Sequence, residues 1–282
     1  MSGEILVLRE QVTLSLDTLA TVWRRENLGD LHNVLVDVAY WRDDDGEKEA
    51  LRLASGELAA KGLLAGRDLA PDFRNTLLLV ARPAVEFYGW IATRDSESEA
   101  KLGVLLAAVD QDAVLVIRDG DQVSLQNARA EGLAETLVGQ LPQVEPARGR
   151  SINLPEHELR TLLGSRVGTA PGAAKPLPAD AYDVFGRASM AEDAQELFTA
   201  MDLPRTGGGE LYVATRDRNG ERHRCASPLV YVDTQSGRWM TQVSGNQPGD
   251  RWVVSTPASR QLLISRLHEM RNALVGSGSP TG

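Results

Sequence analysis

Several residue types are scarce in this sequence, and each shortage excludes a class of protein. Cys225 is the single cysteine among 282 residues, so no disulfide can form within the chain. No run of about 18 apolar residues occurs that could span a bilayer. Basic residues are also in deficit, because 30 Lys and Arg stand against 39 Asp and Glu and leave a net charge of -9. Such a charge repels phosphate backbones and anionic lipids, which disfavours binding to nucleic acids or membrane surfaces.

The N-terminal segment also lacks the features of a secretory signal. Its first charged residue is the acidic Glu4, and its apolar stretch is about four residues long instead of the roughly 7 to 15 that a signal needs. The composition, 42% hydrophobic and 24% charged, is typical of water-soluble globular proteins. We therefore expect a soluble cytoplasmic protein, and 282 residues allow one large domain or two small ones.

Catalytic and metal-binding patterns are equally scarce. The four histidines are scattered, and motifs such as G-x-S-x-G or H-E-x-x-H do not occur. His223 and Cys225 form an H-x-C pair that could serve a thiol-dependent enzyme, but no nearby residue supplies an orienting group or further metal ligands. The contiguous acids Asp43 to Asp45 lack the alternate spacing of a calcium loop and fit a solvated turn that leads into a helix. We expect no enzymatic activity, no metal and no cofactor.

Hydrophobic periodicity predicts the element order ααββββα twice along the chain, after a strand at Val12–Leu16 and a short helix capped by Asp17. Proline-containing first turns and D-G, N-G and S-G pairs mark several helix starts and hairpins. The first set comprises helices at Ser55–Ala65 and Pro71–Val80, strands at Val85–Ala92, Val104–Val109, Val114–Ile117 and Val123–Leu125, and a helix with Leu133, Leu137 and Leu141. The second comprises helices at Pro155–Leu163 and around Ala194–Met201, strands at Glu210–Thr215, Pro228–Asp233, Arg238–Val243 and Trp252–Val254, and a helix from Thr256 to Leu274.

A short sequence repeat supports this internal duplication. Ile91-Ala-Thr-Arg-Asp95 and Val213-Ala-Thr-Arg-Asp217 each end the first strand of one set. The sequence therefore predicts an α+β fold with a central antiparallel sheet, flanking helical bundles and a quasi-two-fold internal repeat, with halves at about 50–150 and 151–276. Segment 164–180, rich in Gly, Ala and Pro, is expected to be a flexible loop, and 276–282 a disordered tail. Trp90, Trp239 and Trp252 fall in predicted strands, where each could fill the core or expose a binding surface.

Several of these segments resemble the EspG family of type VII (ESX) secretion. The resemblance is carried by 81–95 (ARPAVEFYGWIATRD), 113–121 (AVLVIRDGD), 210–217 (ELYVATRD) and 232–239 (VDTQSGRW), and it covers roughly residues 12 to 275. Proteins of this family are cytosolic chaperones that bind the PPE member of a PE/PPE heterodimer, cover its hydrophobic tip and keep the pair soluble. The family fold, a central antiparallel sheet with two helical bundles and quasi-two-fold symmetry, agrees with the repeat described above. The resemblance therefore implies a single EspG-like domain over residues 1–282.

The resemblance implies a PE/PPE heterodimer as partner and a hairpin loop, here 93–103, at the interface. Because this loop is rich in Ser and Glu, we expect it to be mobile when free and to become ordered against the partner. Leu262 and Ile264 flank the apolar stripe Leu263, Leu267, Met270 and Leu274 of the last helix, so they are either further core or an exposed contact patch. The expected partner-binding residues are Thr93, Arg94, Asp95, Ser96, Glu97, Leu102, Leu262 and Ile264. A non-catalytic adaptor unrelated to secretion is the alternative.

Overall fold

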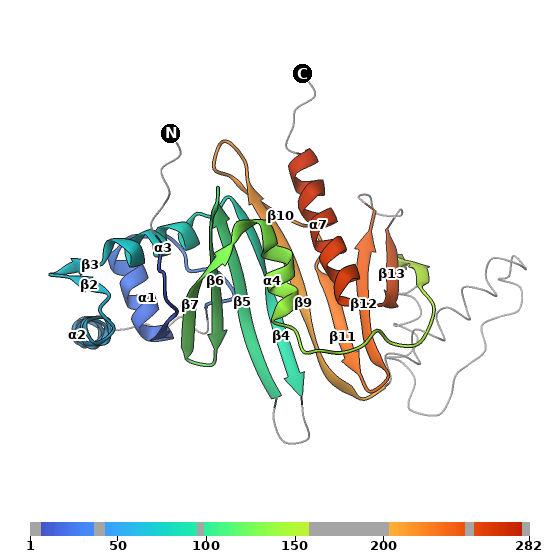
Figure 1. The fold of residues 1–282 in the computed structure, drawn as a ribbon, viewed down its shortest axis with the longest axis horizontal. Coiled ribbons are helices and arrows are strands. Elements are labelled where there is room, and N and C mark those ends of the chain that lie inside the picture. The colour runs from blue at the N-terminus through green and yellow to red at the C-terminus, as the bar shows by residue number, and fades with distance from the viewer. Residues whose placement is uncertain (1–6, 37–42, 95–98, 158–202, 246–250, 278–282) are drawn as a thin grey trace, which may run out of the picture. The chain divides into compact units, whose positions relative to one another are not determined.

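The computed structural model describes the chain except residues 1–6, 37–42, 95–98, 158–202, 246–250 and 278–282. The fold is α+β with an extensive antiparallel sheet, as the sequence predicts (Figure 1). The chain divides into two compact units, each described here by itself. The first comprises Met1–Pro142, Gly209–Ala226 and Ile264–Gly282, and the second comprises Gln143–Gly208 and Ser227–Leu263.

The sheet of the first unit runs in the order β1-β7-β6-β5-β4-β9, and a short strand β10 also pairs with β9. Neighbouring strands in the run β4 to β7 are joined by hairpins, and their registers place Tyr88 opposite Leu105 and Leu105 opposite Val116. The strands are β1 (Val12–Ser15), β4 (Val85–Arg94), β5 (Glu99–Val109), β6 (Asp112–Asp119), β7 (Gln122–Arg129), β9 (Arg205–Arg216) and β10 (Arg222–Arg224).

The helices of this unit begin and end with local signals. Ser15 caps α1 by accepting a hydrogen bond from the Thr18 amide at 3.2 Å, and Asp43 caps α2 by accepting one from the Gly46 amide at 2.8 Å. Pro71 occupies the first turn of α3, where its missing N–H costs nothing. The elements are α1 (Leu16–Arg25), α2 (Asp44–Ala60), the two-stranded pair β2 (Leu64–Ala65) and β3 (Asp68–Leu69), α3 (Pro71–Ala81), a 3-10 turn at Ala130–Gly132, α4 (Leu133–Gly139) and the part of α7 (Arg260–Ser277) from Ile264 onward.

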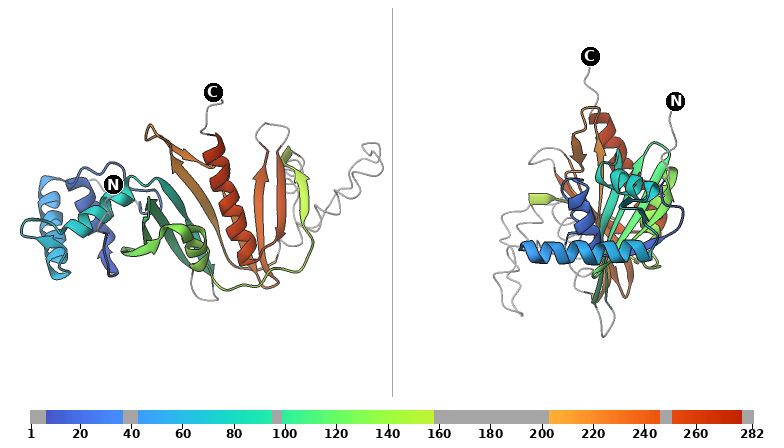
Figure 2. Two further views of the ribbon diagram at one scale, coloured as in Figure 1. Left: turned by 45° about the horizontal axis from the view of Figure 1, so that its top comes forward. Right: turned by 90° about the vertical axis from the view of Figure 1, so that its left-hand side faces the viewer.

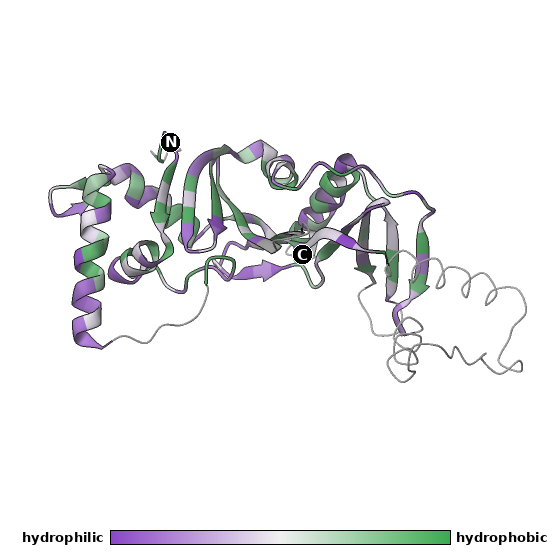
Figure 3. Ribbon diagram, turned by 90° about the horizontal axis from the view of Figure 1, so that it is seen from below, coloured by the Kyte–Doolittle hydropathy of each residue, from purple (hydrophilic) through white to green (hydrophobic). Residues whose placement is uncertain are grey.

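Alternation along the strands gives this sheet two apolar faces. One face carries Tyr88, Leu105 and Val116 and forms a core with buried residues of α1 and α3, among them Trp23 and Phe73. Phe87 lies on the opposite face, where its ring meets that of His268 in α7 edge-on, with 6.5 Å between ring centroids. α1 and α2 pack against each other (Figure 2), and α2 is most hydrophilic at its N-terminal end (Figure 3).

Two glycines are required by backbone geometry in this sheet. In the hairpin between β6 and β7, Asp119 pairs with Gln122, so Gly120 and Asp121 form a two-residue loop and Gly120 adopts a φ of +57°. Gly89 in β4 faces the backbone carbonyl of Glu210 in β9, and a Cβ at this position would collide with that oxygen. The D-G pair therefore marks the predicted hairpin, whereas Gly89 permits the close approach of β9.

The second unit contains the strand order β11-β12-β13-β8, formed by β11 (Leu229–Thr234), β12 (Gly237–Ser244), β13 (Trp252–Pro257) and β8 (Ile152–Pro155). A fully buried ion pair joins β11 to β12, because Arg238 donates to the two carboxylate oxygens of Asp233 at 2.6 and 2.7 Å. The guanidinium also lies 4.9 Å from the centroid of the Tyr231 ring. This cluster fixes the hairpin register from inside the core.

The observed elements confirm most of the predicted order. The order ββββα occurs once as β4 to β7 followed by α4, and again as β9, β11, β12 and β13 followed by α7, where the short strand β10 is an addition between β9 and β11. The division into repeat halves at 50–150 and 151–276 stays a prediction. Of the tryptophans, Trp239 is buried, Trp90 is half-buried and Trp252 is 44% exposed, so the sheet uses them in both ways.

Three predicted helix starts are wrong, each because another residue makes the capping contact. α1 is capped by Ser15 and not by Asp17, and α2 begins at Asp44 and continues through Ser55, whose hydroxyl donates to the Leu51 carbonyl. The last helix begins at Arg260 instead of Thr256, because 256 and 257 extend β13 by pairing with β12, and Ser259 supplies the cap.

Other boundaries differ at the ends of the described ranges. α7 continues to Ser277, so 276 and 277 are helical and are not part of a tail. Pro155 ends β8, whereas the sequence predicts a helix from Pro155 to Leu163; Glu156 and His157 are helical, and 158–163 lie outside the described residues. The loop 164–180, the helix around Ala194–Met201 and residues 278–282 lie outside the described residues.

Candidate functional site

The predicted hairpin site lies between β4 and β5 in the first unit. Thr93 and Arg94 end β4, opposite Ala100 and Glu99 of β5. Leu102 follows in β5, half-buried and opposite the buried Ile91. Asp95, Ser96 and Glu97 lie outside the described residues. The structure thus brings the flanking candidates together on one hairpin.

The candidates in the last helix are both half-buried. Leu263 and Leu267 are fully buried and Met270 is 7% exposed, which confirms the apolar stripe for these three residues. Leu262 and Ile264 lie beside that stripe and keep part of their surface accessible. They remain candidates for a contact patch, although neither is fully exposed.

A ladder of aromatic rings lies on the sheet face that carries Tyr88, opposite the face that carries Phe87, and was not singled out from the sequence. Tyr88 stacks on Tyr212 with 5.2 Å between ring centroids, and Trp90 meets Tyr212 edge-on at 6.0 Å. Two cations cover the outer rings, since Lys101 Nζ lies 5.9 Å from the Trp90 ring centroid and the Arg224 guanidinium lies 5.3 Å from that of Tyr212. Trp90 and Tyr212 are half-buried, so this face presents aromatic surface edged by positive charge.

The inner end of this ladder meets a buried carboxylate. Glu86 of β4 is 2% exposed, and Arg222 of β10 binds both of its oxygens, with Nη2 at 2.7 Å from Oε2 and Nε at 2.9 Å from Oε1. His32 adds a contact from its Nε2 to Oε2 at 3.3 Å. Burial alone would raise the pKa of the Glu86 carboxyl, but the hydrogen bonds from His32 and Arg222 outweigh it and lower this pKa to about 2. Glu86 is therefore a charged anchor between β4, β10 and the segment that carries His32.

The backbone next to His32 orients its ring. The amide of Val34 donates to His32 Nδ1 at 3.3 Å, which leaves Nε2 facing Glu86 Oε2 at 3.3 Å and Arg222 Nη2 at 3.4 Å. Sequence reasoning missed this cluster. The available signal was Glu86 itself, a lone acid at an alternating position of the otherwise apolar strand VEFYGWIA.

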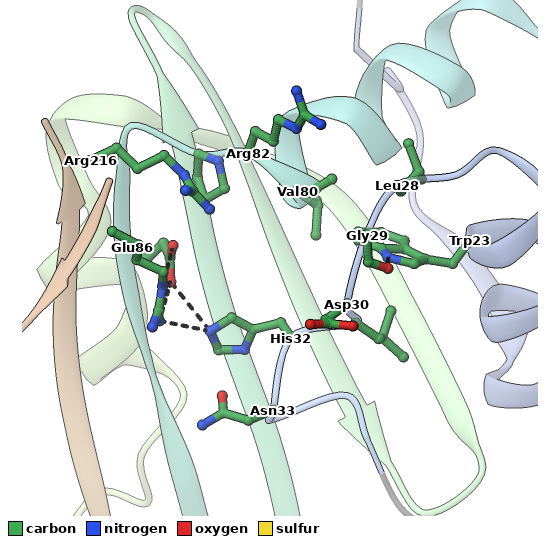
Figure 4. Close-up of a pocket in the computed structure, with 14 residues that line it drawn as sticks. Trp23, Leu28, Gly29, Asp30, His32, Asn33, Val80, Arg82, Glu86 and Arg216 are labelled. Atoms are coloured by element: carbon green, nitrogen blue, oxygen red, sulfur yellow. Dashed lines mark hydrogen bonds and ion pairs between the residues drawn. The ribbon is translucent and has the colours of Figure 1, made fainter. Parts of the chain in front are cut away.

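This cluster forms one wall of a pocket of about 510 Å³ within the first unit (Figure 4). Asp30 and Trp23 lie on the opposite side of the view from Glu86, and Arg216 reaches in from β9 on the Glu86 side. Trp23 itself is fixed by its indole N–H, which donates to the Gly29 carbonyl at 3.0 Å. The lining consists of residues 28–33, 80–83, Trp23, Glu86, Arg216 and Arg222. The pocket thus combines apolar, aromatic and charged groups.

The His223–Cys225 pair does not form a nucleophile and its base. His223 Nε2 contacts Asp217 Oδ2 at 3.2 Å, and the Cys225 sulfur instead accepts a hydrogen bond from the Val213 amide at 3.4 Å. Burial raises the pKa of the Cys225 thiol, whereas a reactive thiolate needs a lowered pKa. The thiol-enzyme reading therefore has no support from this geometry.

A different group around His223 has the spacing of metal ligands. Asp217, Glu221 and His223 offer ligand atoms that lie within 4.8 Å of one another. Asp217 Oδ1, however, accepts hydrogen bonds from the amides of Asn219 and Glu221 at 2.9 and 2.8 Å and so holds the β9–β10 turn. These contacts account for the acid as a turn-forming residue, and the group gives no reason to assign a metal.

Comparisons with known proteins identify a sequence family and a solved structure with the same fold. The sequence model of the EspG family matches residues 15–269. A solved structure with the same fold is that of the Mycobacterium tuberculosis type VII secretion system chaperone EspG5 in complex with a PE25-PPE41 dimer. It is 14% identical, with 97% of this chain and 98% of that chain covered and a TM-score of 0.68. Compared with curated proteins, the sequence gives no match. Among the described residues, no helix is long and apolar enough to cross a membrane.

Proposed function

This chain belongs to the EspG family, and we propose that it is a cytosolic chaperone of type VII secretion that binds PE/PPE heterodimers. It shields the hydrophobic tip of the PPE subunit and keeps the pair soluble for export. The observation that carries this proposal is the family match over residues 15–269. The shared fold with a chaperone solved in complex with a PE25-PPE41 dimer supports it.

We assign the partner contact to the β4–β5 hairpin, the neighbouring sheet face and the last helix. Thr93 to Glu97 and Leu102 supply the hairpin part, and Leu262 and Ile264 supply the helix part. The half-buried rings of Trp90 and Tyr212 suit this role, because an aromatic group that keeps accessible surface gains contact area without unfolding the core. A stable complex of this kind buries roughly 800 Å² on each partner.

We further propose that the protein acts by binding alone. Shielding an apolar tip needs complementary shape and apolar area, and it needs no group with a catalytic pKa. The buried, hydrogen-bonded Cys225 thiol fits this role better than that of a nucleophile. Exchange of Cys225 for Ser should leave partner binding unchanged.

The test is co-expression of the tagged chain with a PE/PPE pair from the same genome. Co-purification of a 1:1:1 complex, and retention of the pair in solution only when the chain is present, is the expected result. Hydrogen exchange across 93–103 should slow when the pair binds. A pair that stays soluble without the chain, and does not co-purify with it, would refute the chaperone function.

Matched variants separate binding from folding. Leu262→Glu and Ile264→Glu should weaken co-purification while the melting temperature stays close to that of the wild type. Leu263→Glu, one residue away and fully buried, should instead unfold the chain. If the first two variants also collapse the fold, these residues belong to the core and the contact lies elsewhere.

A further inference from the structure

The Tyr212 side chain is held from several directions and still keeps part of its surface accessible. Its ring stacks on that of Tyr88 with 5.2 Å between centroids and only 10° between ring planes, and Trp90 meets it edge-on. The Arg224 guanidinium lies 5.3 Å from the ring centroid. The hydroxyl donates to Glu210 Oε2 at 2.7 Å. Tyr212 is nevertheless only half-buried, so an oriented aromatic ring reaches the surface.

The backbone of β9 explains the contact with Glu210. Residues two apart in a strand point to the same face, which places the carboxylate of Glu210 beside the Tyr212 hydroxyl. β9 approaches β4 closely at Gly89, where the Glu210 carbonyl occupies the space that a Cβ would need, and this approach brings Tyr212 against Tyr88. Glu210 is exposed and, within the part of the chain that the structure describes, its carboxylate forms no ion pair. The Tyr212 hydroxyl is therefore its observed hydrogen-bond partner.

The hydrogen bond between these two side chains is charge-assisted. A distance of 2.7 Å is typical of a hydroxyl that donates to a carboxylate. Burial raises the pKa of the Tyr212 phenol, and the bond to Glu210 adds to the rise, which brings this pKa to about 12. The phenol consequently keeps its proton at neutral pH and keeps donating to Glu210.

The position of Tyr212 links it to the predicted partner contact. Trp90, its edge-on neighbour, lies three residues before Thr93 in β4, and Lys101, whose Nζ lies 5.9 Å from the Trp90 ring centroid, precedes Leu102 in β5. The ring surface is thus continuous with the hairpin candidates. Tyr and Trp are common among the residues that dominate binding energies, and a side chain already fixed in one orientation loses little entropy when it binds.

We propose that Tyr212 is the side chain that anchors the PPE subunit on this sheet face, and that Glu210 is a positioning residue that acts through Tyr212. Apolar side chains of the PPE tip cover the accessible part of the Tyr212 ring. The Glu210 carboxylate holds the ring in its stacked orientation and does not itself contact the partner. This assignment rests on the chaperone function proposed above.

The test is a competition between full-length chains. Untagged variants are added to a complex of the tagged wild-type chain with a PE/PPE pair from the same genome, and the displaced fraction gives their relative affinity. Tyr212→Ala should bind at least about 30-fold more weakly, as expected of a dominant contact residue. Glu210→Ala should bind about fivefold more weakly, because the ring loses one hydrogen bond that orients it. Glu221→Ala, an exposed acid in the β9–β10 turn, should bind as the wild type does.

A double-mutant cycle separates positioning from direct contact. Tyr212→Phe keeps the ring but loses the hydroxyl, so it should match Glu210→Ala, and the double variant should bind no more weakly than either single variant. NMR of the free chain labelled with ¹³C-tyrosine gives a readout without the partner. In Glu210→Ala the ring signals of Tyr212 should move toward those of free tyrosine, while those of the buried Tyr231 stay in place.

The outcomes distinguish this assignment from the chaperone function. If the wild-type chain forms no complex with the pair, both are overturned. If the complex forms but Tyr212→Ala competes as well as the wild type, the anchor is wrong and the chaperone function stands. Losses that multiply in the double variant would show that Glu210 contacts the partner directly, and unchanged Tyr212 ring signals in Glu210→Ala would show that Glu210 does not orient the ring. Either result overturns its positioning role.

Discussion

Replacement of Glu86 by Gln tests whether this buried carboxylate is charged in the folded chain and stabilises it. The folded chain lowers the pKa of this carboxyl from its ordinary 4.5 to about 2. At about 1.4 kcal/mol per pKa unit, this shift corresponds to about 3 kcal/mol of stability. Because the folded-state pKa is depressed, that contribution is complete above pH 4.5 and is lost as the pH falls toward 2.

The lowered pKa of Glu86 leads to two measurable effects on stability. At pH 6, Glu86→Gln should unfold about 3 kcal/mol more easily than the wild type, in line with the usual cost of breaking a buried ion pair. Between pH 6 and pH 3.5 the wild type should lose about 1 kcal/mol of the Glu86 contribution, since pH 3.5 still lies above the folded-state pKa. The variant lacks this titration, so the gap between the two proteins should narrow by that amount.

Urea unfolding followed by circular dichroism at both pH values measures the difference in the free energy of unfolding between the wild type and the variant. Glu269→Gln is the matched control, because Glu269 forms an exposed ion pair with Arg266. Its gap to the wild type should stay within about 0.5 kcal/mol at pH 6. A gap for Glu86→Gln that is equal at pH 6 and pH 3.5, or near zero at pH 6, would refute the assignment of Glu86 as a charged anchor.

Three further outcomes are expected. Asp233→Asn should destabilise the second unit by about 3 to 5 kcal/mol in urea unfolding, because the buried Arg238 then loses the carboxylate charge that it binds through two hydrogen bonds, and a wild-type midpoint would contradict this. The Cys225 thiol should react with a disulfide reagent far more slowly in the folded chain than in urea, and equal rates would show that the thiol is accessible. Leu267→Ala should lower the free energy of unfolding by about 2 to 5 kcal/mol, whereas Val275→Ala on the exposed side of the same helix should change it by less than about 0.5 kcal/mol.

The sequence alone determined the local structure of this protein well. Aromatic and β-branched content located β4 and β5, two strand-like segments beside the D-G pair located β6 and β7, and proline in the first turn located α3. The D-G pair at 119–120 located a hairpin because few residues other than Gly accept the φ of +57° found at Gly120. These signals are short-range, so each could be read without knowing what the segment packs against.

Helix boundaries were less well determined, because several polar residues near each start could make the N-cap hydrogen bond. Ser15, Asp43 and Ser259 make the capping contacts in the structure, whereas the sequence predicted helix starts at Asp17, Ser55 and Thr256. At residues 256 and 257, strand pairing with β12 overrode a Thr-Pro pair that is typical of a helix start. Pairing with a distant strand is a tertiary contact that the local pattern does not contain.

The tertiary structure alone decided the charged and aromatic clusters. Glu86 meets an arginine 136 positions away, and Tyr88 stacks on Tyr212. Nothing in the spacing of these residues predicts the contacts, because they arise from the close approach of β9 to β4 at Gly89. The sequence by itself determined which segments become strands and to which family the pattern belongs, since both depend on residue order. The pairing of those strands determined which side chains share a site, because burial and charge neutralisation act through space and not along the chain.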